Sequence, residues 1–297
     1  MKWPGLQILG IGVQTDQYAD AAALARHVAD ACHLSPEPGV WIGEALADDR
    51  QPADSSLDLV TQYAFAAIAQ AWRAAGLSAA AVAPQRVALL FTSCWGAMDS
   101  TAAFLESMFD QDGRYASPRC FTRSVYSSTA SLAAIRFGIQ GPCETLIHDA
   151  WIVSGLLERA SDLLGHGRAD TVLLCWADQS SPVAKELCVR AVRALGQRQY
   201  ERYVSNELGF GALALALAWP SAGRPGRPCL ELRPTPVRTG LRDVDSTRLT
   251  AHPFPCDAAL ALAAAILEPG RGAAGPAPRS WLERDHRGQG RQVEIHF

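Results

Sequence analysis

The sequence predicts an α/β fold in which helices cover a largely buried sheet. Two segments, Arg86–Thr92 and Asp170–Ala177, are apolar along most of their length, which is typical of strands buried on both faces. The clearest helix, Ser56–Ala75, places its apolar residues at helical spacing on one face. Because buried strands alternate with helices along the chain, we expect a layered α/β arrangement.

The expected helix Ser56–Ala75 has identifiable ends. Ser55 or Ser56 is expected to cap its first turn, and Gly76 is expected to stop it. Before this helix, the sequence predicts a strand over Leu6–Val13 and a helix over Asp20–Cys32. After it come helices over Ala102–Met108 and Ser127–Phe137, a short strand over Glu144–His148, and helices over Trp151–Leu164 and Val183–Ala194.

The pattern changes after residue 210. Leu213, Leu215 and Leu217 alternate with alanines, as expected of a strand. The segment Arg224–Pro228 is rich in proline and glycine and indicates a turn, so we predict a β-hairpin over Gly211–Arg233. The remaining expected elements are a helix over Asp257–Leu267, a loop over Glu268–Arg279 and a last strand over Arg291–Phe297.

Composition excludes several classes of protein. The chain has 297 residues, of which 48% are hydrophobic and 19% charged, so it can bury a full core. A net charge of −3 argues against a nucleic-acid binder. The longest apolar helical stretch, Ala258–Leu267, is shorter than the roughly 20 residues of a membrane span. The N-terminal segment lacks the features of a signal peptide, so we expect a cytoplasmic protein.

Generic motifs give no active site. The eight cysteines are spread over the chain without a C-x-x-C pair, which predicts reduced thiols. His252 and Cys256 lie four residues apart, but no further ligands lie nearby in the sequence, so we expect neither a metal site nor a cofactor. Cys94 follows an expected strand, but nothing local supplies a base, so we expect an ordinary packed thiol.

Two short motifs lie in the middle of the chain: Phe137–Pro142 reads FGIQGP, and Gly167–Asp170 reads GRAD before the next expected strand. This part of the chain resembles the β-ketoacyl synthases of the thiolase-like superfamily, which carry FGLRGP and RGRAD at these places. The order of further motifs extends the resemblance over residues 6–219. These motifs are Leu9–Val13, Ala116–Pro118 with Phe121, and Asn206–Ala212.

This resemblance implies a thiolase-like layered α-β-α-β-α fold. Its first half, residues 1–219, would be a complete ketosynthase-like N-terminal half. Residues 220–297 would be a reduced C-terminal remnant with a hairpin, a helix and a final strand. Together the two parts would form one compact domain.

The chain departs from the family at the nucleophile. The family's cysteine lies eight residues after the proline of its GP pair and twenty before the aspartate of GRAD; both counts reach Ala150 here. An alanine cannot form a thioester, and Cys143 lies in the wrong turn. The family's HGTGT histidine and its lysine are also missing, because the only lysines are Lys2 and Lys185. His252 faintly resembles the second histidine but has no nucleophile to serve.

The resemblance therefore implies a subunit without condensing activity of its own. It resembles the truncated chain length factors of type II polyketide and aryl-polyene systems, which pair with a catalytic ketosynthase and shape its acyl tunnel. The partner would be that ketosynthase in a heterodimer, with acyl carrier protein reached through it, and no nucleic acid. The residues expected at the tunnel or interface are Phe121, Tyr126, Leu146, Ile147, His148 and Trp151.

Two alternatives remain open at this point. One is an enzyme that decarboxylates malonyl-loaded carrier protein, although Ala150 weighs against it. The other is an acyl- or carrier-protein-binding module that works alone. Independently of these alternatives, each aromatic residue assigned to the tunnel, such as Tyr126 or Trp151, could equally be an ordinary core side chain.

Overall fold

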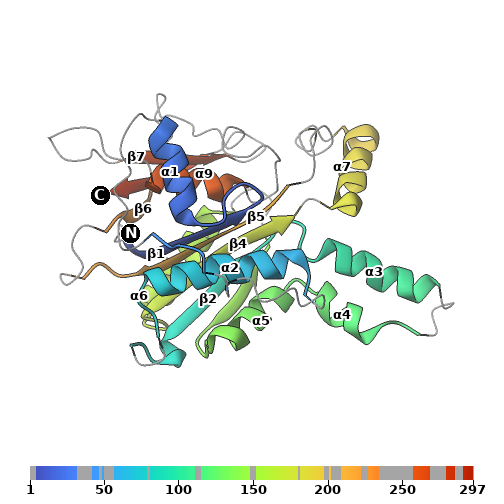
Figure 1. The fold of residues 1–297 in the computed structure, drawn as a ribbon, viewed down its shortest axis with the longest axis horizontal. Coiled ribbons are helices and arrows are strands. Elements are labelled where there is room, and N and C mark those ends of the chain that lie inside the picture. The colour runs from blue at the N-terminus through green and yellow to red at the C-terminus, as the bar shows by residue number, and fades with distance from the viewer. Residues whose placement is uncertain are drawn as a thin grey trace.

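The described strands of the chain form one mixed sheet in the order β3-β2-β4-β5-β1-β6-β8-β7 (Figure 1). The computed structural model describes residues 5–31, 42–46, 49, 57–78, 81–110, 115–147, 152–179, 181–196, 201, 209–221, 227–233, 257–267, 279–284 and 290–296. The strands are β1 (Leu6–Thr15), β2 (Val87–Thr92), β3 (Cys143–Leu146), β4 (Thr171–Gln179), β5 (Phe210–Ala218), β6 (Cys229–Arg233), β7 (Arg279–Arg284) and β8 (Gly290–His296). The helices are α1 (Ala21–Ala31), α2 (Leu59–Ala74), α3 (Met98–Phe109), α4 (Pro118–Ser124), α5 (Ser128–Phe137), α6 (Ser154–Gly165), α7 (Pro182–Leu195) and α9 (Asp257–Leu267), with a 3-10 turn at Pro84–Arg86.

The sheet combines a parallel part and an antiparallel part. Strands β3, β2 and β4 run parallel, with Val87 opposite Thr171 and Leu89 opposite Cys143. The neighbours from β4 to β7 pair antiparallel. All ten residues of β1 are buried, because β5 lies along one edge of this strand and β6 along part of the other.

The predicted hairpin over Gly211–Arg233 is wrong. Strands β5 and β6 form at the expected places, but they do not pair with each other, because β1 lies between them. The alternation of leucine and alanine predicts a strand correctly, but it carries no information on the neighbour. A mostly apolar strand such as β1 loses most exposed surface in the middle of the sheet, and this placement separates the two later strands.

Helices cover both faces of the sheet, as the predicted layered fold requires. Leu213, Leu215 and Leu217 of β5 face one core cluster, together with side chains of α1, α6 and α9. The alternating alanines of β5 face the other cluster, together with α2 and α5. The alternation in the sequence thus separates a leucine face from an alanine face of the same strand.

Small residues of β1 and β5 let α2 lie close against the sheet. A Cβ added at Gly10 would lie 2.3 Å from the carbonyl oxygen of Ala71, and one at Gly12 would lie 2.0 Å from that of Ala67. Only glycine fits beneath the helix at these two positions. The helix begins at Leu59, and its cap is Asp58, which accepts a hydrogen bond from Thr61 N, so the expected capping by Ser55 or Ser56 is wrong.

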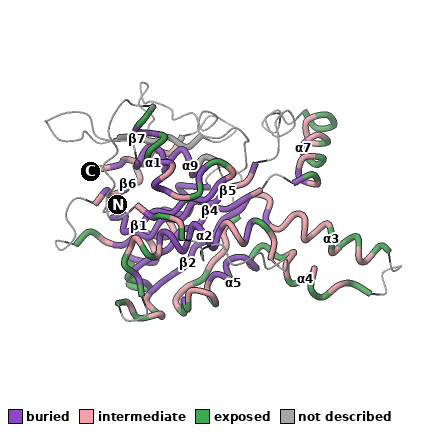
Figure 2. The backbone as a smooth tube through the Cα atoms, viewed as in Figure 1, coloured by how far each residue is buried: buried purple, intermediate pink, exposed green. Residues whose placement is uncertain are grey.

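Three helices extend away from this core. Helices α3, α4 and α7 reach out from the end of the sheet where β2 and β4 finish (Figure 1). None of the residues of α3 and α4, all of which the structure describes, is buried, and the two helices appear pink and green in Figure 2. We call α3 and α4 with their described connection the α3–α4 arm. The sequence analysis did not predict α4 as a helix or β7 as a strand.

None of the described helices is long and apolar enough to cross a membrane. Among the other expected segments, the loop Glu268–Arg279 lies outside the described residues except for Arg279, which begins β7.

Candidate functional site

The candidate site lies where the parallel strands β3, β2 and β4 end. Ligands of open α/β sheets bind at the carboxyl ends of the strands, where the connecting loops meet. The loop Ser93–Ala97 joins β2 to α3 at this edge, and Asp178 lies near the end of β4. The segment that follows β3 contains position 150, which the resemblance assigns to the nucleophile.

Asp178 holds the loop after β2 in place. Its carboxylate accepts hydrogen bonds from Ser93 Oγ at 2.7 Å, from the backbone N–H of Cys94 at 2.6 Å and from that of Trp95 at 3.0 Å. Ser93 Oγ in turn accepts a bond from Gly96 N at 2.7 Å. Asp178 is only 1% exposed, so these bonds take the place of water around a buried carboxylate.

Tyr126 packs against this loop. A Cβ added at Gly96 would lie 2.6 Å from Cε1 of the Tyr126 ring, and Gly96 has a φ of 58°, so glycine is required here on both counts. Burial raises the pKa of Tyr126, and the nearby charges of Asp178 and Cys94 raise it further. Tyr126 therefore stays a neutral phenol that closes one side of the candidate site.

Strand β3 forms the edge of the sheet in the part of the chain that the structure describes. Thr92 Oγ1 donates a hydrogen bond to the carbonyl oxygen of Leu146 at 2.7 Å, which ties the two strand ends together. Leu146 packs in part against the core, whereas Ile147 is 50% exposed. The strand is Cys143–Leu146, slightly earlier than the expected Glu144–His148.

An ion pair anchors β3 to the helix behind it. Arg159 of α6 donates two hydrogen bonds to the carboxylate of Glu144, at 2.7 Å and 2.6 Å. The bonds from Arg159 lower the pKa of Glu144, so this carboxylate stays ionised at neutral pH. The Arg159–Glu144 ion pair holds β3 against α6, and none of the other described strands pairs with the outer edge of β3.

The start of α6 is buried beneath the site. Ile152, Val153 and Ser154 are buried, and Trp176 of β4 donates a hydrogen bond from Nε1 to the carbonyl oxygen of Ile152 at 2.7 Å. This contact anchors the chain two residues after position 150. Four of the expected site residues, His148, Ala150, Trp151 and His252, lie outside the described residues.

The structure thus brings Tyr126 next to the loop that Asp178 holds and places Leu146 and Ile147 at the same sheet edge. Phe121 instead lies on the α3–α4 arm, where its ring packs on Phe104 with the centroids 5.4 Å apart. The sequence analysis missed Ser93 and Asp178. Their signal was available, because each is a polar residue at the end of a buried strand.

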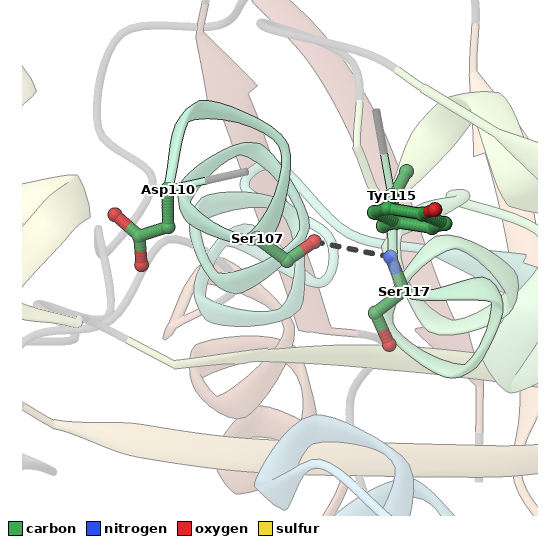
Figure 3. A pocket seen from close by; sticks show the side chains of 5 residues that line it. Ser107, Asp110, Tyr115 and Ser117 are labelled. Atoms are coloured by element: carbon green, nitrogen blue, oxygen red, sulfur yellow. Dashed lines mark hydrogen bonds between the residues drawn. The ribbon is translucent and has the colours of Figure 1, made fainter. Parts of the chain in front are cut away.

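A hollow lies on the α3–α4 arm, away from the candidate site. Its volume is about 450 Å³, and Figure 3 shows Ser107 Oγ accepting a hydrogen bond from Ser117 N, at 3.1 Å, beside the ring of Tyr115. The carboxylate of Asp110 points away from that ring (Figure 3). Residues near the end of α3 and before α4 line this hollow. Among these lining residues, no acidic side chain lies next to a basic one.

Comparisons with known proteins agree on the fold. Residues 44–175 match the family model described as "Beta-ketoacyl synthase, N-terminal domain". The ishigamide ketosynthase/chain length factor superimposes with a TM-score of 0.69 and 16% identity over 99% of both chains. A ketosynthase of a type II polyketide system, solved in complex with its acyl carrier protein, gives 0.68 and 14% over 99% of both chains.

A third similar structure contains a ketosynthase and its chain length factor. The ketosynthase ApeO in complex with its chain length factor ApeC, from Xenorhabdus doucetiae, gives a TM-score of 0.58 and 13% identity over 99% of both chains. No curated protein sequence matches the chain. The family match covers the loop after β2, Tyr126, β3 and the start of β4, and it ends before Asp178. The structural matches cover almost the whole chain. Residues 44–175 are therefore similar to the β-ketoacyl synthase N-terminal domain, and the chain has the fold of the ketosynthase structures.

Proposed function

We propose that this chain is a non-catalytic ketosynthase-like subunit, a chain length factor. It pairs with a catalytic β-ketoacyl-acyl carrier protein synthase and helps to shape the acyl tunnel of that partner. The observation that carries the proposal is Ala150, which stands where the family places its nucleophilic cysteine. Alanine has no group that can accept an acyl chain.

The neighbouring thiols do not replace that nucleophile. Cys143 lies on β3, and desolvation raises the pKa of its thiol, as does the charge of Glu144. Burial raises the pKa of Cys175 far above its ordinary value. Because the thiolate is the reactive form, the raised pKa values lower the fraction of reactive thiolate on both cysteines at neutral pH, which supports the proposal.

The surface around the candidate site supports a partner subunit. Edge strands left uncovered invite pairing with another chain, and β3 has one neighbour among the described strands. Apolar side chains exposed beside it, on the α3–α4 arm and at the ends of β3 and α4, would be covered by a partner. They are Leu105, Phe109, Phe121, Val125, Tyr126 and Ile147.

The similar structures support the same assignment. The ishigamide protein is described as a ketosynthase/chain length factor, and ApeO was solved with its chain length factor ApeC. The proposed heterodimer would place Tyr126, with its ring at the loop after β2, beside the tunnel of the catalytic subunit. Phe121 and Trp151 are the other side chains proposed to limit the depth of that tunnel.

The proposal includes the division of the chain. Residues 1–219 form the ketosynthase-like half, and residues 220–297 are a reduced remnant of the second half. In its support, β6 pairs with β1 and β8 pairs with β6, so the two parts share one sheet and one core. A cut between them would remove strands from a common sheet.

Intact-mass spectrometry tests the proposal. The chain is incubated with acyl-loaded and malonyl-loaded carrier protein, and a catalytic ketosynthase serves as the positive control. We expect no covalent acyl adduct on this chain and no condensation product from the Ala150→Cys variant alone, because the histidines that drive the reaction are incomplete. A stoichiometric acyl adduct on any cysteine, or ketoacyl product from that variant without a partner, would contradict the proposal.

A further inference from the structure

We propose that Glu231, Glu294 and His296 bind one divalent transition-metal ion, with Zn²⁺ as the principal candidate. The three residues lie on the neighbouring strands β6 and β8, at the far side of the sheet from the candidate functional site. Leu230, Val293 and Ile295 of the same strands face the core. By the alternation of side chains along a strand, the three polar residues share the opposite face.

The strand register assembles these ligands. Glu231 lies directly opposite Glu294, and His296 lies two residues further along β8 on the same face. One ligand atom from each residue lies within 4.8 Å of the other two. Because the residues are far apart in the sequence, no spacing motif reveals the site, and only the pairing of β6 with β8 brings them together.

The distances fit a shared ion. Nε2 of His296 lies 3.3 Å from Glu231 Oε2 and 3.4 Å from Glu294 Oε2. Two ligand atoms bound at about 2.0–2.1 Å to a tetrahedral ion lie about 3.3 Å apart. The Nε2 atom is itself buried, and within the described residues its close polar contacts are these two carboxylate oxygens, although the side chain is 39% exposed at its outer parts.

Electrostatics also favour a cation at this position. Two carboxylates directly opposite each other on an antiparallel pair repel and destabilise the sheet. Gln292 donates a hydrogen bond to Glu294 Oε1 at 3.2 Å, which turns the other carboxylate oxygen toward His296. An outer contact of this kind orients a metal ligand. A bound dication would offset the repulsion and fasten β8 to β6.

The ligand types select the class of metal. Imidazole nitrogen together with carboxylate oxygen suits Zn²⁺ and similar first-row ions. Mg²⁺ and Ca²⁺ prefer all-oxygen sites, so we expect neither to compete. The exposed outer part of His296 leaves room for water in the remaining coordination position.

Calorimetric titration of the full chain with Zn²⁺ alone, after treatment with a chelator, tests the site. We expect one ion per chain and at least tenfold weaker binding in the His296→Gln and Glu231→Gln variants. His166→Gln, which changes an exposed histidine on the α6–β4 connection, serves as the matched control and should leave binding unchanged. Bound Zn²⁺ should also raise the melting temperature of the wild-type chain, because it binds the folded state.

Co²⁺ absorption of the wild-type chain keeps the test independent of variant folding. We expect the spectrum of a nitrogen- and oxygen-ligated ion. A thiolate-to-cobalt charge-transfer band would overturn the proposal, because it would place the ion on a cysteine. So would the absence of Zn²⁺ binding, equal binding of Mg²⁺, or binding that a folded His296→Gln variant retains.

Discussion

The carboxylate of Asp178 organises the loop that begins at the end of β2. It accepts bonds from Ser93, Cys94 and Trp95, which are consecutive in the chain, and so fixes three residues of the loop with one side chain. The loop in turn supports the ring of Tyr126 through Gly96. A single buried charge thus sets the shape of the candidate site.

Replacing Asp178 with asparagine should destabilise the protein. The amide group keeps one oxygen but turns N–H donors toward the donors of the loop, so we expect a loss of about 2–3 kcal/mol in the free energy of unfolding. Urea denaturation measures it. Asp170→Asn is the matched control, because Asp170 pairs with Arg86 at the exposed surface, where water screens the ion pair and its loss should lower the free energy of unfolding much less. Equal effects of the two variants would show that the loop does not depend on Asp178.

Removing the ring of Tyr126 tests its proposed place beside the tunnel. In the complex with the catalytic ketosynthase, Tyr126→Ala should shift the products toward longer chains while synthesis continues, at a cost of about 1 kcal/mol in stability. Mass spectrometry of the products measures the shift. Tyr115→Ala is the control, because Tyr115 is a more exposed tyrosine, at the far hollow of the α3–α4 arm. Unchanged product length in a folded Tyr126→Ala complex would refute the tunnel role.

At the scale of the elements, β3 and the α3–α4 arm are, with α7, the described parts that the core encloses least. Strand β3 pairs only with β2 among the described strands, and α3 and α4 contribute no buried residue. The other two strands of the parallel part, β2 and β4, place their side chains in the two core clusters. The uncovered elements lie on both sides of the candidate site, which is where the proposed partner would bind.

A charge at Ile147 should weaken the binding of the partner without unfolding the chain. Ile147 is half exposed, so a lysine can reach water, whereas Leu146 packs against the core and its replacement would also destabilise the fold. For Ile147→Lys we expect the dissociation constant of the heterodimer to rise about 100-fold, as for a central interface residue. Leu46→Lys, at an exposed leucine outside β3 and the arm, should leave that constant unchanged. Tight binding by folded Ile147→Lys would place the interface elsewhere.

The elements show which features a single sequence can predict. The sequence predicts α2, α5, α7, α9, β1, β2 and β4 to within a few residues. Most of these elements bury an apolar face, whereas α5 and α7 bury few residues. Periodicity fails for the pairing of β5 and β6, since a buried central strand from the other end of the chain separates them. It also misses α4, whose seven residues bury nothing and give no apolar pattern.

Only some residues of the candidate site could be predicted from the sequence. The resemblance predicts Tyr126, Leu146 and Ile147 as site residues. In the structure, Leu146 and Ile147 lie at the end of the edge strand β3, and Tyr126 lies against the loop after β2. Asp178 was missed, because its role depends on three donors on a distant loop. The ligands Glu231 and His296 were missed for a similar reason, since their proximity arises only from strand register.

For the whole molecule, the fold and the proposed loss of the nucleophile lead to one account. The chain has the fold of the ketosynthase structures over almost its full length, the resemblance assigns Ala150 to the nucleophile position, and β3 has a single neighbour among the described strands. On the proposed reading, such a fold would still offer an interface and a tunnel wall to a catalytic partner. The central claim is therefore that the chain acts through a heterodimer.

Light scattering during size-exclusion chromatography tests that claim most directly. The chain is measured alone, and again after co-expression with a candidate catalytic ketosynthase partner. Our account predicts a stable particle with the summed mass of one copy of each subunit, and its loss in the Ile147→Lys variant. A wild-type chain that runs as a stable monomer, both alone and mixed with that ketosynthase, would contradict the account.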